Sequence, residues 1–100
     1  MAYENSIIGQ IGNTPLVEAT HLLNKEGVRL FLKLEGNNPG GSVKDRPAFN
    51  MINEALKRGD IKKGGTLVEA TSGNTGIALA FISKLLGLNM VFILLLNKIR

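Results

Sequence analysis

The sequence predicts an α/β fold: a strand-helix-strand-helix-strand layer with a parallel sheet. The hydrophobic period changes from two to about 3.6 and back again from Val28 onward. Two glycine-rich loops, at 36–41 and 71–76, separate the apolar stretches. Short strand-helix-strand connections are right-handed, and in such layers function is expected in the loops at the carboxyl ends of the strands.

The part of the chain before Val28 has the weakest pattern, consistent with a turn followed by an edge strand over 11–17. Alternating apolar and polar residues over 28–34 predict a strand with at least one buried face. The glycine-rich segment with Pro39 ends that strand.

A helix follows, because apolar residues recur at i, i+3, i+4, i+7 and i+8 and form one stripe. These residues are Ala48, Met51, Ile52, Ala55 and Leu56. Gly59 is placed to end the helix.

The second half of the layer begins with a short strand over 66–69. The next helix, over 75–86, is so rich in apolar residues that most of its circumference should be buried, and Gly87 closes it. The nearly continuous apolar run over 88–96 is typical of a parallel strand covered on both faces.

Length and composition predict one small globular domain, or part of one. The chain has 100 residues, of which 44% are hydrophobic and 20% charged, close to the average of soluble proteins. The net charge is +4, but the basic residues never form a block longer than two and only 5% of residues are aromatic. This pattern favours a solvated surface over nucleic-acid binding.

Several other function classes are disfavoured by the residues present. The chain has no cysteine, which excludes disulfides and thiolate nucleophiles and fits a reducing compartment. The single histidine, His21, has no second ligand at metal spacing, so no metal site is expected. The first residues lack the features of a secretory signal, and the cytoplasm is the default location.

The apolar stretch 77–96 has nearly the length of a membrane span. Lys84 lies near its middle, and a central lysine costs about 2.5–3.5 kcal/mol on insertion scales. We therefore expect no membrane segment.

The first loop places Lys44 at the beginning of a helix. Either Ser42 and Asp45 form a capping box, or Asp45 caps the helix and Pro47 lies near the first helical position. In both arrangements the ammonium faces the positive end of the helix, which favours the neutral amine that can attack an aldehyde. The alternative is a surface lysine in a flexible loop. A phosphate-binding P-loop is disfavoured, because Ser42-Val43 stand where Lys-Ser or Lys-Thr is required.

The second loop joins a strand to a helix and offers hydroxyls, an amide and free backbone N–H groups. Its residues are Thr71, Ser72, Gly73, Asn74, Thr75 and Gly76. Helix N-termini bind carboxylates through such donors, so the loop is a candidate site for a small anion. The alternative is a plain N-cap turn, which a single hydroxyl would satisfy.

Together the two loops resemble the fold-type II pyridoxal-phosphate enzymes of the cysteine synthase (O-acetylserine sulfhydrylase) group. The resemblance covers the chain up to Met90 and rests on segments in the order and spacing of that family. These are Ile11–Val17, Lys33-Leu34-Glu35, Asn38-Pro39, Ser42-Val43-Lys44-Asp45-Arg46 and the run from Glu69 to Ala80.

The resemblance implies a role for each loop. Lys44 would hold pyridoxal 5'-phosphate covalently and move the substrate α-proton, and Asn74 would hydrogen-bond the 3'-oxygen of the cofactor. The residues Thr71, Ser72, Gly73, Asn74 and Thr75 would bind the substrate carboxylate. The implied reaction is β-replacement, in which O-acetylserine and sulfide give L-cysteine in cysteine biosynthesis.

The subfamily is less sharply defined. Glu69-Ala70, where many relatives have Glu-Pro, resembles the B-type sulfhydrylases, whereas Gly40-Gly41-Ser42 is also similar to cystathionine β-synthases. Cystathionine β-synthase is therefore the alternative activity. Full-length members of the family are expected to be homodimers.

Members of this family are far longer than 100 residues, so we expect residues 1–100 to be a truncated N-terminal portion of the enzyme. The family's later phosphate-binding loop and second domain are not in this sequence, and the isolated chain should be inactive or nearly so. A further alternative is a non-catalytic fragment or interaction module, because the apolar last strand would leave surface exposed.

Overall fold

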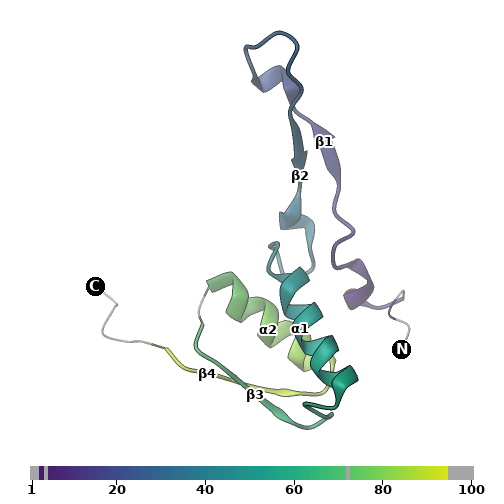
Figure 1. The fold of residues 1–100 in the computed structure, drawn as a ribbon, viewed down its shortest axis with the longest axis vertical. Coiled ribbons are helices and arrows are strands. Elements are labelled where there is room, and N and C mark those ends of the chain that lie inside the picture. Colours follow the sequence, from purple (N-terminus) through teal and green to yellow (C-terminus); the bar gives the residue numbers. More distant parts are fainter. Residues whose placement is uncertain (1–2, 4, 72, 95–100) are drawn as a thin grey trace.

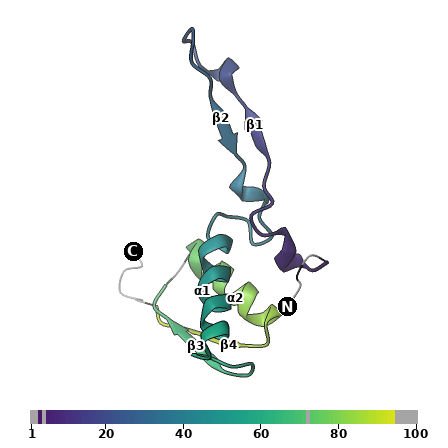
Figure 2. The same ribbon diagram turned by 45° about the vertical axis from the view of Figure 1, so that its right-hand side comes forward.

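The computed structural model describes residues 3, 5–71 and 73–94. It is elongated and flat, measuring 54 × 44 × 19 Å. Figures 1 and 2 show an arm of two antiparallel strands that projects from a body of two helices and two parallel strands.

The arm consists of β1 (Leu16–Glu18) and β2 (Phe31–Lys33), which pair antiparallel with Leu16 opposite Lys33. Three short 3-10 helices flank these strands: Ile7–Gln10, Thr20–Leu22 and Glu35–Asn37. The expected strands at 11–17 and 28–34 are both present, in shorter form. The second of them pairs with β1 and does not join the parallel sheet, so the expected layer is one strand shorter.

The body follows the order expected from the sequence. Its elements are α1 (Asp45–Arg58), β3 (Thr66–Glu69), α2 (Gly73–Leu85) and β4 (Asn89–Phe92). The strands β3 and β4 pair in parallel, with Thr66 opposite Asn89, and α2 forms the crossover between them. The predicted α/β class with a parallel sheet is confirmed.

Helix α1 forms where the apolar stripe predicts it. Ala48 and Ile52 on this stripe are buried, while Met51 at its edge is 53% exposed. The helix ends at Gly59, which has a positive φ of 80°, a conformation that glycine adopts without a steric penalty.

The hydrophobic core lies between the two helices and one face of the β3–β4 sheet. Its buried members come mainly from α1 and α2. They are Ala48, Ile52, Ala78, Leu79, Ile82 and Leu88. This packing fixes the position of α1 relative to α2, and therefore the relative position of the loops that precede these helices.

The sheet is covered on one face only, contrary to the expectation for the last strand. In β4 the exposed and half-buried side chains alternate, and Val91 is 48% exposed. Val68 of β3 is also exposed. Both helices lie on the other side of the sheet (Figure 1), and within the described part of the chain nothing covers this face.

Two further expectations about burial are wrong, because no described residue covers the side chains concerned. Ile77 and Leu85 on α2 are about half exposed, so less of that helix is buried than its composition predicts. In β2, Phe31 and Leu32 are both exposed, so the strand has no buried face. In the arm and on the outer side of α2, the described residues do not provide enough apolar surface to cover all the apolar side chains.

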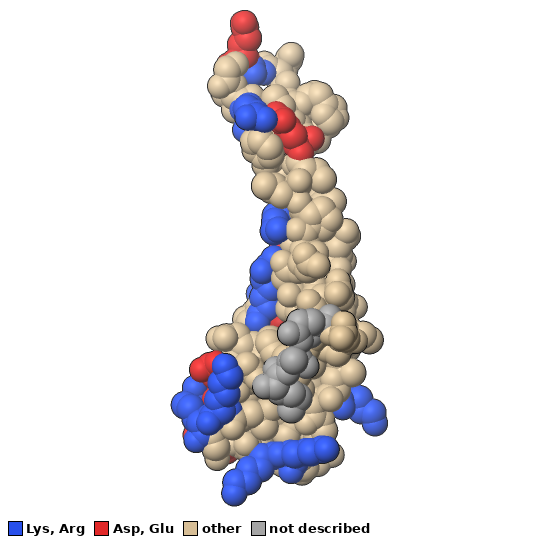
Figure 3. Space-filling view, turned by 90° about the vertical axis from the view of Figure 1, so that its right-hand side faces the viewer, with Lys and Arg blue, Asp and Glu red and all other residues tan. Residues whose placement is uncertain are grey.

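The basic residues do not form a single patch. Figure 3 shows Lys and Arg in separate groups along the arm and around the body, with uncharged surface between them. No helix in the described ranges is long and apolar enough to cross a membrane.

Candidate active site

Lys44 is the residue immediately before α1, and it has helical backbone angles (φ −67°, ψ −15°). Its side chain is exposed. Among the described residues, the Lys44 amine has no hydrogen-bond or ion-pair partner. A primary amine is therefore exposed at the start of a helix, and no other described side chain or backbone group binds it.

Neither capping arrangement expected from the sequence is formed. No side chain caps the N-terminus of α1. Instead the Ser42 hydroxyl accepts the backbone N–H of Lys44 (3.1 Å), and the Asp45 carboxylate accepts the backbone N–H of Gly40 (2.6 Å). Both side chains turn back toward the loop, so they fix the loop that leads to Lys44.

Asp45 is fully buried beneath this loop. A Cβ atom on Gly40 would overlap with the Asp45 carboxylate, so only glycine fits there. The glycine-rich loop is therefore closely packed against the first turn of α1.

The second loop lies between β3 and α2. Helix α2 begins at Gly73, two residues earlier than the sequence predicts, so Asn74 and Thr75 stand in its first turn. Asn74 is exposed, and Thr71 and Thr75 are half-buried. Ser72, also expected at this site, lies outside the described residues.

The structure brings the two loops to the same end of the helical layer. In Figures 1 and 2 the first turns of α1 and α2 lie side by side, below the base of the arm. Both helices lie on one face of the sheet, so Lys44 and the Asn74 turn are on the same side of it.

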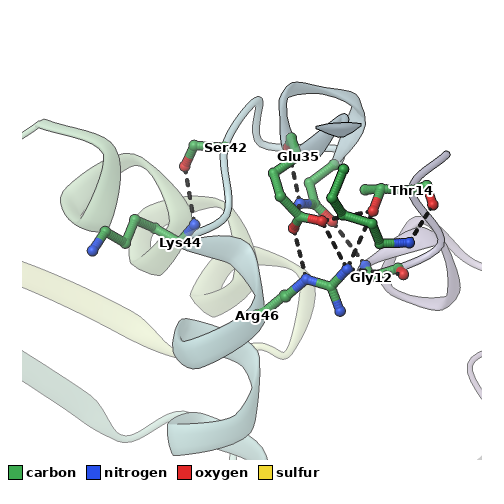
Figure 4. A network of polar contacts seen from close by, with 8 residues as sticks. Gly12, Thr14, Glu35, Ser42, Lys44 and Arg46 are labelled. Carbon is green, nitrogen blue, oxygen red and sulfur yellow. Dashed lines mark hydrogen bonds and ion pairs between the residues drawn. The ribbon is translucent and has the colours of Figure 1, made fainter. Parts of the chain in front are cut away.

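A group of polar residues beside Lys44, which we call the junction cluster, was not predicted from the sequence. It joins the base of the arm to the first turn of α1 (Figure 4). Its members are Gly12, Thr14, Glu35, Asn38 and Arg46. Arg46 and Glu35 lie in segments that resemble the family, and their opposite charges were the feature of the sequence that could have indicated an ion pair.

The Glu35 carboxylate is the centre of this cluster. It accepts Arg46 Nε (2.6 Å) and Nη2 (2.9 Å) and the Thr14 hydroxyl (2.7 Å). These hydrogen bonds, with that from Arg46 the strongest, lower the pKa of Glu35 from 4.5 to about 2. Glu35 is therefore ionised at any physiological pH.

Metal binding has no support in this part of the molecule. The described residues contain no group of three or more His, Cys, Asp or Glu side chains that could hold an ion. His21 is exposed on the 3-10 helix Thr20–Leu22 in the arm.

Comparison with known proteins identifies the family. A family model described as pyridoxal-phosphate dependent enzyme matches residues 7–98. The chain belongs to this family. Among curated proteins it is 59% identical over 86 residues to cysteine synthase B of Salmonella typhimurium and 49% identical over 82 residues to an O-acetylserine dependent cystathionine beta-synthase of Bacillus subtilis.

These matches cover 86% and 82% of this chain but only 28% and 27% of the relatives. The chain therefore spans less than a third of the length of these family members. Among solved structures, O-ureido-L-serine synthase superposes with a TM-score of 0.83 at 43% identity over 90% of this chain and 28% of that one. The fold described above is thus the fold of the corresponding part of pyridoxal-phosphate dependent enzymes.

The residues present suit the cofactor of this family. Pyridoxal phosphate carries an aldehyde that reacts with a primary amine, and Lys44 offers an exposed amine without a partner among the described residues. The adjoining first turn of α2 contains the Asn74 amide and the Thr75 hydroxyl. Both features are placed where helix N-termini favour anionic groups.

Proposed function

We propose that this chain is the N-terminal part of a cysteine synthase, which forms L-cysteine from O-acetylserine and sulfide. The observation that carries the proposal is the exposed Lys44 amine at the start of α1, which has no partner within residues 5–71 and 73–94 and lies next to the polar turn that begins α2. The 59% identity to a cysteine synthase B supports this choice among the activities of the family.

In this proposal Lys44 binds the cofactor and takes the proton from the substrate α-carbon. Pyridoxal phosphate, when bound, withdraws electrons from that carbon and so permits the acetate group at the β-position to leave. The turn over 71–75 binds the substrate carboxylate, through the hydroxyls of Thr71, Ser72 and Thr75 and the backbone of Gly73. The Asn74 amide holds the cofactor ring through its 3'-oxygen.

The role of Lys44 is tested by treating the chain with pyridoxal phosphate, reducing it with borohydride and locating the labelled lysine by peptide mapping. We expect the label on Lys44 in preference to Lys25, which lies in the arm and is also exposed. The Lys44→Ala variant should lose that label and keep its helical circular dichroism, because the side chain has no structural partner among the described residues. Labelling of another lysine in preference to Lys44 would contradict the assignment.

The reaction itself is best tested in a chimera, in which residues 1–90 replace the corresponding part of the Salmonella cysteine synthase B. We expect this chimera to form cysteine and its Lys44→Ala variant to form none. The 100-residue chain alone should form no measurable cysteine, because the relatives are more than three times as long.

A cystathionine β-synthase-type activity is the second candidate. It is supported by the 49% identity to the Bacillus protein and by a Helicobacter pylori O-acetylserine dependent cystathionine beta-synthase structure with a TM-score of 0.76 at 37% identity, covering 94% of this chain and 31% of that one. Replacing sulfide by homocysteine in the chimera assay separates the two. Faster turnover with homocysteine would favour this candidate.

The setting of the enzyme is part of the proposal. We infer a cytoplasmic protein that is a homodimer in its full-length form, as expected for the family. The exposed apolar side chains of the arm and of the open sheet face are surfaces on which further protein could pack. If the chain is instead a non-catalytic interaction module, a purified partner complex would form without any Lys44 labelling.

A further inference from the structure

Arg46 lies two residues after Lys44, in the first turn of α1, and makes four polar contacts. Two go to the Glu35 carboxylate through adjacent nitrogens, in the paired arrangement that a guanidinium forms with a carboxylate. The other two go from Nη2 to the Gly12 carbonyl oxygen (3.1 Å) and the Thr14 hydroxyl (3.2 Å). One side chain thus joins α1 to both segments at the base of the arm.

The partners of Arg46 are themselves held in place. The Asn38 amide oxygen accepts the Gly12 N–H (2.7 Å), and its nitrogen donates to the Glu35 carboxylate (3.0 Å). Asn38 is only 3% exposed, and Thr14 is also buried. A Cβ atom on Gly12 would lie 2.8 Å from Arg46 Nη1, so the backbone and the guanidinium are in close contact.

The Lys44 side chain, in contrast, is held by nothing among the described residues. Its direction therefore depends on its backbone, which is fixed from two sides. The Asp45 carboxylate binds the loop at Gly40, and Arg46 binds the base of the arm. Figure 4 shows Lys44 and Arg46 projecting in opposite directions from the start of the helix.

The helix geometry explains this arrangement. With 3.6 residues per turn, side chains two positions apart point roughly 200° apart around the axis. When Arg46 is bound to the junction cluster, Lys44 must therefore project away from it. The cluster fixes the rotation of the first turn, and the rotation fixes the direction of the amine.

We propose that Arg46 and Glu35 are positioning residues for Lys44: their ion pair holds the first turn of α1 in the rotation that presents the amine to the cofactor site. This inference rests on the proposed function of Lys44. It assigns no contact between Arg46 or Glu35 and the cofactor, substrate or reacting atoms.

The test uses the 100-residue chain with four variants. Glu35→Gln and Arg46→Gln break the ion pair, and the double variant removes both charges. Glu54→Gln is the matched control, because it breaks an exposed ion pair with Lys57 (3.4 Å) on the same helix. All are treated with pyridoxal phosphate and borohydride, and the label on Lys44 is compared with that on Lys25 in the same sample.

We expect Glu35→Gln and Arg46→Gln each to lower the ratio of Lys44 to Lys25 labelling by at least about tenfold, since misplacement of a reacting group by about 1 Å can cost 10²-fold. The double variant should lose no more than either single variant, because the two residues act as one unit. Glu54→Gln should leave the ratio unchanged. All ratios are measured below the urea midpoint of each variant, so that a loss of stability alone does not move them.

Amide hydrogen exchange at Lys44 and Arg46 provides a readout that needs no cofactor. Exchange should be faster in Glu35→Gln and Arg46→Gln and unchanged in Glu54→Gln. If Lys44 is labelled in the unmodified chain and equally well in the ion-pair variants, the positioning role is wrong while the proposed function stands. If the unmodified chain shows no preference for Lys44, the proposed role of Lys44 fails, and exchange rates that are also unchanged would overturn the positioning role.

Discussion

Replacement of Ile82 tests the packing that places α2, and with it the turn over 71–75, against α1. Ile82 is 0% exposed near the C-terminal end of α2 and belongs to the core shared with Ala48 and Ile52 of α1. Removing its side chain takes away buried contacts and leaves a cavity that the surrounding helices only partly fill. Ile82→Ala should cost about 2–5 kcal/mol and Ile82→Val about 0.5–1.5 kcal/mol of unfolding free energy.

Ile77 provides the matched control, because it is the same residue type on the same helix and is 54% exposed. The change in helix propensity is identical for the two positions, so only burial differs. Ile77→Ala should change stability by less than about 0.5 kcal/mol. Urea unfolding followed by circular dichroism at several protein concentrations measures all three variants.

Equal costs at Ile77 and Ile82 would refute the burial on which this reasoning depends. A midpoint that rises with protein concentration would identify the reason, because a second copy of the chain would then be covering the open side of α2. A concentration-independent result with a large cost only at Ile82 is the outcome that we expect.

Three further predictions follow from single contacts. The pKa of Glu35 is lowered from 4.5 to about 2, so its ion pair stabilises the fold above about pH 4.5, and this stabilisation is lost as the pH falls toward 2. The difference in urea midpoint between Glu35→Gln and the unmodified chain should therefore shrink between pH 4.5 and pH 2. A constant difference would contradict this prediction. Gly40→Ala should destabilise the loop, because the new Cβ would overlap with the Asp45 carboxylate; faster exchange of the backbone amide at position 40, which donates to Asp45, measures this. Gly76→Ala should instead stabilise α2 by about 0.5–1 kcal/mol, since its Cβ would meet Phe92 and Thr71 only at ordinary distances of 3.7–3.8 Å, and a lowered thermal midpoint would refute this.

The helices and the parallel pair could be predicted from the sequence because their signals are local. The apolar stripe and Gly59 define α1, and Gly87 follows the end of α2 as expected. Strand pairing is not local: the alternation over 28–34 predicts a strand but not its partner, which is β1. The exposure of one face of β4 could not be predicted either, because hydrophobicity reports what the whole fold would bury, and this chain spans 28% of its relative.

The site shows the same division. Lys44 and the turn over 71–75 could be proposed as site residues from the sequence, because their residue types are unusual for the places they occupy in it. The junction cluster was missed because the contacts that join its separate segments span 11 to 34 positions, such as Glu35 with Arg46 and Gly12 with Arg46. No periodicity connects residues at such separations. The capping spacing of Ser42 and Asp45 does not give a capping box, because these side chains accept the backbone N–H groups of Lys44 and Gly40 instead.

The spacing between Lys44 and Arg46 matters as much as their identities. At a separation of three or four residues, a lysine and an arginine at the start of a helix would share one face. The lysine amine would then lie beside the Arg46 guanidinium, where like charges repel and where the Glu35 carboxylate would bind it as a second cation. At a separation of two residues, Arg46 binds the junction cluster while the Lys44 amine has no partner among the described residues. An amine without a partner is what reaction with an aldehyde requires.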